Sequence, residues 1–503
     1  MNSEIELKFY LRDDSVAQIE PILADFSILQ NEVRHLRSVY FDTKQRQLRR
    51  WRMGLRIRSG DEQNVQTVKT AGRVVGGLHD RPEYNQVVDG SRPQLSRFEN
   101  LPWPEEVDLS ELENALLPIF VTDFKRTTWL VDLQNETLVE VALDSGKLEV
   151  DGREEPICEL ELELVKGDVG QLFFLGEKLS SLGALILGST SKAKRGYALA
   201  DGLPSEQPIR LGFVPLENDD SLPHALHKSV DYALSHWQRH QQVYIDSLSY
   251  RALSELKQAA QLIHQVVSMY QDVVEFSCPW HDDLLWLIRQ LGWLDEACHI
   301  QRLMDDQGKF IRKLTNKRTI YRQLEQRLSE LPDTDEVLQL LSSERYNKLM
   351  LALIQWVYQK EDMQAKQSLS LNEFASTALQ ECWQKLRDSE FGEQLSLDFN
   401  QYTRLAGQLK RNLMLGNCLG ALFEATSRDE FRSLWLDLLG GIEDLRLLEP
   451  IAELADDSVE NKDEAKQLNK WLKRKQDSIT DAMEFTRTQA LSKADYWLLN
   501  NVS

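Results

Sequence analysis

The sequence predicts an α+β domain followed by an all-α domain. Residues 1 to about 201 alternate apolar and polar side chains with a period of two, which is typical of β-strands. From about 221 to 503 the apolar side chains instead recur at the i, i+3 and i+4 spacing of helices. The segment 202–220 contains three prolines and shows neither period, so we expect it to be the linker.

Eight segments of the first domain have the alternation of strands, and Gly, Asp, Asn or Pro residues bound them. They are EIELKFYL (4–11), RSVYFDT (37–43), GLRIRS (54–59), NVQTVKTA (64–71), RPEYNQVV (81–88), TTWLVDL (127–133), TLVEVALDSGKLEV (137–150) and PICELELELV (156–165). Two helices interrupt them: one over about 15–29, capped by Ser15, and one over about 168–182, ending at Gly183.

Charged side chains share one face of several of these strands, because successive strand residues point to opposite faces. Glu4, Glu6 and Lys8 show the pattern at the start of the chain. The whole set comprises the cationic residues Lys8, Arg56, Arg58, Lys69, Arg81 and Arg126 and the anionic residues Glu4, Glu6, Glu140, Asp144, Glu159, Glu161 and Glu163. Two arrangements fit this pattern: an open sheet with a solvated, salt-bridged face, or a closed barrel with a charged lumen.

A charged lumen would need a multiply charged ligand, because each unpaired buried ion costs several kcal/mol. Guanidinium groups pair with phosphate oxygens in bidentate fashion, whereas clustered carboxylates tolerate one another around a hard cation. In the barrel arrangement, the residues therefore describe a site for a metal-bound polyphosphate.

The bulk composition excludes several classes of protein. A formal net charge of -21 argues against non-specific binding of nucleic acid. The five cysteines are Cys158, Cys278, Cys298, Cys382 and Cys418; they form no CxxC pair, so we expect a reducing compartment and neither disulfides nor a zinc site. The chain shows no signal-peptide pattern and no run of about 18 apolar residues, so we expect a cytoplasmic protein without a membrane span.

Several motifs of the first domain occur in a characteristic order. ExExK is present as Glu4, Glu6 and Lys8. It is followed by YFDT (40–43), GLRIR (54–58), QTVKTAGRVVGGLHDRPEYN (66–85), FKRTTW (124–129), ELELEL (159–164) and SKAKRGYAL (191–199). With these motifs residues 1–201 resemble CYTH domains, the triphosphate tunnel metalloenzymes, and most of all the bacterial inorganic triphosphatases that pair a CYTH with a CHAD domain. The resemblance implies an eight-stranded antiparallel tunnel that hydrolyses triphosphate to pyrophosphate and phosphate with Mg²⁺ or Mn²⁺.

The resemblance also assigns roles to residues. The catalytic set would be Glu4, Glu6, Lys8, Arg56, Arg58 and Lys69. The triphosphate would be held by Lys8, Arg56, Arg58, Lys69, Arg81, Arg126, Lys192 and Arg195. The metal ligands would be Glu4, Glu6, Glu161 and Glu163, with Glu159 and Asp144 beside them and Glu83 and Glu140 as further partners.

The second domain, residues 221–503, resembles a degenerate CHAD domain, which implies two four-helix bundles that meet near residue 365. CHAD helices bind polyphosphate through basic, histidine-containing faces. The corresponding stretch here, SYRALSELKQAAQLIHQ, keeps only Arg251 and Lys257, and the second bundle keeps Lys410 and Arg411. This reduction argues against polyphosphate binding by the helical half.

Three functions remain open from the sequence. The first is a cytoplasmic inorganic triphosphatase. Its substrate would be inorganic triphosphate, or else another triphosphate compound or polyphosphate, and we expect it to bind neither nucleic acid nor membrane. The second is a class IV adenylate cyclase or a thiamine triphosphatase, because these enzymes share the tunnel. The third is a protein that binds or senses polyphosphate without catalysis. The intact set of carboxylates weighs against the third, and the oligomeric state stays open.

Overall fold

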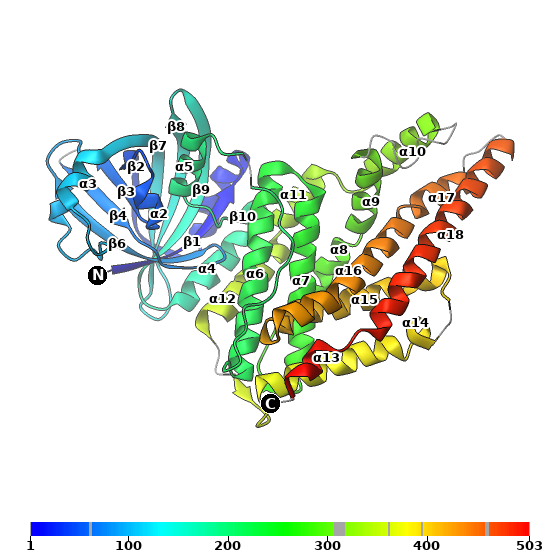
Figure 1. The fold of residues 1–503 in the computed structure, drawn as a ribbon. Coiled ribbons are helices and arrows are strands. Elements are labelled where there is room, and N and C mark those ends of the chain that lie inside the picture. Colours follow the sequence, from blue (N-terminus) through cyan, green and yellow to red (C-terminus); the bar gives the residue numbers. More distant parts are fainter. Residues whose placement is uncertain are drawn as a thin grey trace. The chain divides into compact units, whose positions relative to one another are not determined.

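A computed structural model of the chain describes residues 2–59, 63–204, 206–305, 317–360, 363–393, 396–457 and 462–501 (Figure 1). Its internal contacts divide the chain into two units. The first unit comprises Met1–Glu206, Ile245–Ser247 and Asp335–Gln359, and the second comprises Gln207–Tyr244, Leu248–Thr334 and Lys360–Ser503. No helix in the described ranges is both long and apolar enough to cross a bilayer.

An antiparallel ring of eight strands forms the first unit, which confirms the predicted tunnel (Figure 1). In order around the ring these are β1 (Asn2–Leu11), β9 (Arg153–Lys166), β8 (Leu138–Val150), β7 (Leu116–Asp132), β2 (Ser27–Thr43), β3 (Gly54–Ser59), β4 (Asn64–Lys69) and β6 (Leu78–Val88). The ring closes because β6 pairs with β1 as well as with β4. Two short strands lie outside it: β5 (Arg73–Val75) pairs with β6, and β10 (Leu185–Leu187) pairs with β1.

The first unit also contains helices. They are η1 (Asp13–Gln18), α1 (Ile19–Leu23), α2 (Gln47–Arg50), η2 (Leu95–Arg97), α3 (Leu109–Ala115), α4 (Val169–Ser180), α5 (Lys192–Asp201), α11 (Thr334–Ser342, whose first residue belongs to the second unit) and α12 (Glu344–Gln359). The prediction for α4 agrees with the structure: Asp168 caps it, and Gly183 follows with a φ of +62°.

The prediction of one helix over 15–29 is wrong. A 3-10 turn and the short helix α1 end at Leu23, and strand β2 already begins at Ser27. Ser15 lies inside the 3-10 turn, whose N-cap is Arg12 without a side-chain cap. The helix is short because only Ile19 and Leu23 find buried positions, while the following residues pair with β7.

The second unit is helical, which confirms the predicted class. Its helices are α6 (Leu222–Ser247, whose last three residues belong to the first unit), α7 (Tyr250–Tyr270), α8 (His281–Gln290), α9 (Leu294–Asp305), α10 (Lys317–Ser329), α13 (Leu371–Arg387), α14 (Glu390–Glu393), α15 (Phe399–Leu419), η3 (Gly420–Leu422), α16 (Ala425–Arg446), α17 (Glu449–Asp457), α18 (Lys462–Ser492) and η4 (Tyr496–Asn501). Strands β11 (Val274–Glu275) and β12 (Gln364–Ala365) form a small ladder. Buried aromatic rings, among them Trp383 and Trp435 with centroids 4.6 Å apart, fill its core.

Candidate active site

The inner face of the ring carries the charged residues that the sequence singles out. Residues directly opposite each other on antiparallel strands share a face; Glu4 lies opposite Arg81, and Lys8 lies opposite Glu161. The same register puts on this face Glu6, Arg56, Arg58, Lys69, Glu83, Arg126, Glu140, Asp144, Glu159 and Glu163. The tunnel is therefore lined by charges of both signs.

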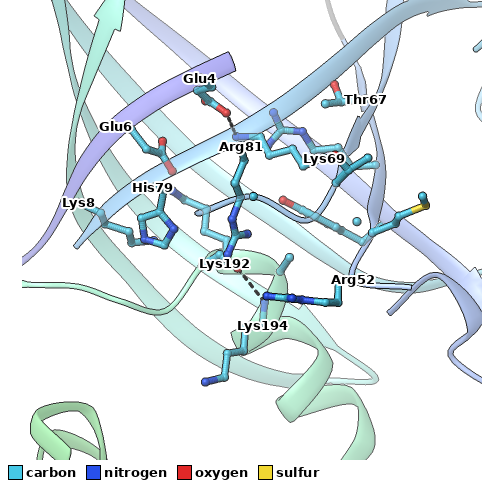
Figure 2. A pocket seen from close by; sticks show the side chains of 18 of the residues that line it. Glu4, Glu6, Lys8, Arg52, Thr67, Lys69, His79, Arg81, Lys192 and Lys194 are labelled. Atoms are coloured by element: carbon cyan, nitrogen blue, oxygen red, sulfur yellow. Dashed lines mark hydrogen bonds and ion pairs between the residues drawn. The ribbon is translucent and has the colours of Figure 1, made fainter. Parts of the chain in front are cut away.

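A cavity of about 280 Å³ lies between these side chains. Of the predicted site residues, its lining includes Glu4, Glu6, Lys8, Arg56, Arg58, Lys69, Arg81, Arg126, Glu161 and Lys192, but not Glu83, Glu140, Asp144, Glu159, Glu163 or Arg195. Figure 2 shows Glu4, Glu6 and Lys8 in sequence along β1, with Arg81 and His79 beside them and Lys192 and Lys194 on helix α5.

Lys192, the first residue of α5, lies at the centre of a cluster of ion pairs. Its Nζ is 2.7 Å from Asp144 and 2.8 Å from both Glu159 and Glu161. Arg126 binds Asp144 through two hydrogen bonds of 2.6 and 2.7 Å, and it donates to Glu161 at 2.6 Å. These carboxylates already have cationic partners in the free protein.

Lys8 and Arg195 belong to the same cluster. Lys8 pairs with Glu159, and Arg195 donates to Glu159 at 2.6 Å and to Glu155 at 2.5 Å. Burial alone would raise the pKa of Glu159, but Lys192 and Lys8 outweigh burial and lower it to about 2. Glu159 is therefore fully ionised and neutralised by its neighbours at neutral pH.

Three arginines of the tunnel have no such partner. Arg56, Arg58 and Arg81 form no ion pair with a carboxylate of the described residues. The Nε groups of Arg56 and Arg81 are buried without a hydrogen-bond acceptor, and Arg58 donates from Nε only to Ser38 Oγ, at 3.2 Å. The positive charge of Arg56, together with burial, lowers the pKa of Arg58. The three guanidinium groups are thus available to bind an anion.

A row of carboxylates crosses three neighbouring strands. Glu140 on β8 lies opposite Glu163 on β9, Glu163 lies opposite Glu6 on β1, and Glu6 lies opposite His79 on β6. Burial first, and then the charges of Glu6 and Glu140, raise the pKa of Glu163 to about 7. The row therefore carries more negative charge than its surroundings neutralise.

Lys69 is shared by two more carboxylates beside this row. It pairs with Glu4 and, at 3.0 Å, with Glu83. Burial, helped by the charges of Glu6 and Glu83, raises the pKa of Glu4 to about 8 in spite of Lys69. Burial would also raise the pKa of Glu83, but Lys69 and Arg56 lower it to about 2. Glu83 is thus held in its ionised form by Lys69 and Arg56, whereas Glu4 resists ionisation.

Glu4, Glu6 and Glu163 fit a hard divalent cation, because a cation would relieve their repulsion and because carboxylate oxygens are the ligands that Mg²⁺ and Mn²⁺ prefer. The described residues of the tunnel hold no three such ligand atoms within 4.8 Å of one another. The protein side chains alone therefore do not form a closed cation cage.

The group in the described chain that does gather three ligand atoms lies in the second unit and consists of His236, His240 and Glu255. Its ligand atoms are occupied: His240 Nε2 accepts the Ile209 N–H at 3.1 Å, and Glu255 Oε2 accepts the Leu211 N–H at 3.2 Å. His236 Nε2 lies 3.1 Å from the same Glu255 oxygen. We assign this group a structural role, since it fastens the extended segment before α6 to α6 and α7.

His79 is a site residue that the sequence analysis did not identify. It is 2% exposed, and burial, with the charges of Arg81 and Lys8, lowers its pKa to about 3. Because of this lowered pKa, the ring is neutral at physiological pH. Its Nε2 has no hydrogen-bond partner. A signal was present in the sequence, because His79 lies two residues before Arg81 and so shares its strand face.

The sequence analysis also did not identify other residues that line the cavity. Tyr40, Arg49, Arg52 and Lys194 also line it. Arg49 and Arg52 lie in and just after the one-turn helix α2, where no strand alternation marks a face. Their position depends on the return of the chain from β2 to β3, which the sequence pattern does not specify.

The fold and its lining define a closed antiparallel tunnel in which three guanidinium groups without carboxylate partners lie on the same inner face as a surplus of carboxylates. The chain contains a CYTH domain, matched over residues 2–197, and a CHAD domain, matched over residues 228–453. Both confirm the resemblance found in the sequence.

The inorganic triphosphatase of Haemophilus influenzae is 40% identical to this chain over 200 residues, which cover 40% of this chain and 55% of that protein. The chain thus spans about half the length of this curated relative. Among solved structures, the CHAD domain of Ricinus communis matches with a TM-score of 0.47 and 16% identity over 58% of this chain and 98% of that one. A Hippeastrum adenylyl cyclase homologue, described as having a dominant triphosphatase activity, matches with a TM-score of 0.29 and 18% identity over 40% of this chain and 95% of that one.

Proposed function

We propose that the protein hydrolyses inorganic triphosphate to pyrophosphate and phosphate inside the tunnel, with Mg²⁺ or Mn²⁺ as the metal. The observation that carries the proposal is the separation of unbalanced charges. Arg56 and Arg58 on β3 have no carboxylate partner, and Glu163 stands on β9, four strands away in a ring of eight. A polyanion carrying a divalent cation would satisfy both sides at once.

The three unpaired arginines are the residues proposed to hold the substrate. Their guanidinium groups would bind the phosphate oxygens and stabilise the charge that develops on the leaving pyrophosphate. In the reaction, water adds to a terminal phosphorus, the bond from that phosphorus to the bridging oxygen breaks, and one proton is released. No side chain needs to form a covalent bond with phosphorus.

Glu4, Glu6 and Glu163 are the residues proposed to hold the metal, with Glu140 beside them. When bound, the cation supplies neutralisation of phosphate charge. The ionised carboxylates would also orient the attacking water by accepting its hydrogen bonds. Lys69, which shares Glu4 and Glu83, would keep these side chains aligned.

Lys8, Arg126, Lys192 and Arg195 were predicted to bind triphosphate directly. All four are ion-paired in the free protein, so a direct contact would require an exchange of partners. We propose that they mainly hold Asp144, Glu159 and Glu161, and that Lys8 and Lys192, which also line the cavity, reach phosphate when the substrate is bound.

The size of the cavity favours the inorganic substrate over an adenylate cyclase or thiamine triphosphatase activity. Its volume of about 280 Å³ is below the range of roughly 300 to 1,000 Å³ of pockets that enclose drug-sized ligands. A nucleoside would have to extend beyond it.

We extend the proposal to the helical half and to the location of the protein. Two of the basic residues that the CHAD-like helices retain are neutralised: Lys257 lies 3.2 Å from Asp295, and Lys410 lies 2.7 Å from Glu443. This pairing supports the prediction that the helical half binds polyphosphate weakly. The proposed location is the cytoplasm, where the thiols stay reduced.

One assay tests the proposed activity. The purified chain with Mg²⁺ or Mn²⁺ is offered triphosphate, ATP, thiamine triphosphate and long-chain polyphosphate, and phosphate, pyrophosphate and cyclic AMP are measured. We expect the fastest release of phosphate from triphosphate and no cyclic AMP. Absence of phosphate release from triphosphate between pH 7 and about 10, where lysines begin to titrate, would refute the proposal.

A further inference from the structure

Helix α12 lies within the residues matched by the CHAD domain, yet it belongs to the unit that forms the tunnel. It packs on α4 and β10, with Leu351 against the backbone at Gly176 and Ile354 and Val357 fully buried. Asn347 donates its side-chain amide to the carbonyl of Leu185 in β10 at 2.7 Å. The helix is therefore an integral part of the tunnel unit.

The last turn of α12 is bound by an arginine of the tunnel. Arg73 on β5 donates to the carbonyls of Val357 at 2.9 Å and Tyr358 at 3.2 Å. Carbonyls in the last turn of a helix lack partners within the helix and carry its negative dipole, so a guanidinium fork is well suited to them. The same guanidinium lies 5.2 Å from the centre of the Tyr358 ring.

Tyr358 also contacts strand β6: its hydroxyl group donates a hydrogen bond to Asp80 Oδ2 at 3.2 Å. Arg73 and Asp80 are direct partners across β5 and β6. The end of α12 is therefore fastened to both strands of one hairpin. We call Arg73, Asp80 and Tyr358 the α12 clamp.

Two residues of the cavity flank the clamp on strand β6. Asp80 points to the outer face, so its neighbours His79 and Arg81 point into the tunnel, where both line the cavity. Gly72, just before β5, allows a close approach: a Cβ there would lie 2.2 Å from the carbonyl oxygen of Asp80 and 2.8 Å from Cα of Arg81. A displacement of Asp80 would thus be transmitted directly to Arg81.

We propose that the α12 clamp positions Arg81 for substrate binding, so that a helix from the CHAD region sets the affinity of the tunnel. The inference rests on the proposed function, because it takes triphosphate as the ligand of Arg81. Arg73, Asp80 and Tyr358 are positioning residues: they lie on the outer face of the hairpin and act through Arg81.

The test measures binding of inorganic triphosphate to the full chain by calorimetry, for the wild type, Tyr358→Phe, Arg73→Ala, Arg81→Ala and the double variant Tyr358→Phe/Arg81→Ala. Tyr358→Phe removes only the hydroxyl group. We expect each clamp variant to raise the Kd by roughly tenfold, the effect of losing one hydrogen bond to a charged group. In the Arg81→Ala background, Tyr358→Phe should have no further effect, because the two act through one contact.

A second readout and a control separate positioning from general damage. Hydrogen exchange of the amides of β5 and β6 should accelerate in Tyr358→Phe. Lys348→Ala, on the same helix in an exposed pair with Glu344, should change neither exchange nor Kd. Arg73→Lys, which keeps the charge but not the fork, should restore part of the affinity.

The outcomes distinguish the two proposals. If the wild type does not bind triphosphate, the proposed function falls and this inference falls with it. If the wild type binds triphosphate and the clamp variants bind it equally well, or if Tyr358→Phe and Arg81→Ala weaken binding additively, only the inference is overturned.

Discussion

Arg126 and Asp144 lie opposite each other on β7 and β8 and form a buried, bidentate ion pair with distances of 2.6 and 2.7 Å. Asp144 is 0% exposed and also accepts Lys192 at 2.7 Å. Two cations from separate elements thus share this carboxylate. Asp144→Asn should lower the free energy of unfolding by about 3 kcal/mol, as breaking a buried pair does. Urea unfolding measures this, and an unchanged midpoint with an unchanged slope would show that the cluster is dispensable for stability.

Arg58 should behave in the opposite way, because it forms no ion pair with a carboxylate of the described residues and the charge of Arg56 disfavours its own. Arg58→Ala should leave the melting temperature unchanged or slightly higher. It should raise the KM for triphosphate by at least tenfold, since a hydrogen bond to a charged group is worth about 1.5 to 3 kcal/mol. Steady-state kinetics and thermal unfolding of the same preparation test the contrast. A large loss of stability with little change in KM would place Arg58 among the structural cations.

Proton uptake by Glu4 and Glu163 should make the stability of the metal-free protein depend on pH. Burial raises the pKa of Glu4 to about 8 and that of Glu163 to about 7, whereas both titrate near 4.3 in the unfolded chain. Between pH 5 and 8, as an approximate window, the folded protein holds more protons than the unfolded one, so stability falls as pH rises. The melting temperature after treatment with a chelator should decrease from pH 6 to pH 8, and Glu163→Gln should flatten that decrease. A melting temperature independent of pH in this window would contradict the proposed ionisation.

Removal of a carboxylate proposed to hold the metal should be detected without any assay of activity. Glu6→Gln removes the charge at the β1 end of the row of Glu140, Glu163 and Glu6, so the affinity for Mn²⁺ should fall by roughly tenfold or more, on the scale of lost charged contacts. Titration of Mn²⁺ followed by electron paramagnetic resonance measures the free ion. Glu154→Gln is the matched control, since Glu154 is an exposed carboxylate paired with Lys147. Equal affinities of the two variants would exclude the row as the metal site.

The strands could be predicted because period-two alternation is a local property. Each of the eight predicted segments falls in a different ring strand, and three of them extend one or two residues beyond it. The helix over 15–29 failed because pairing of residues from Ser27 onwards with β7 outweighs local helical spacing. The division of the cations into paired and unpaired ones was also beyond the sequence. The alternation predicts which face of the sheet Arg58 and Arg126 share. Only the register of the strands shows that Arg126 lies opposite Asp144, whereas Arg58 lies opposite Val65 on β4.

The inclusion of α12 in the tunnel unit has a consequence for biosynthesis. The contacts of Arg73 with Val357 and of Leu185 with Asn347 join residues 284 and 162 positions apart. On the ribosome, the ring strands emerge long before the helix that covers α4 and β10. Contacts of such long sequence separation form slowly, because the intervening chain must first be closed into a loop. An apolar surface of the nascent tunnel therefore stays uncovered until residue 359 has been synthesised, and exposed surface of this kind is prone to aggregation and is a target of chaperones.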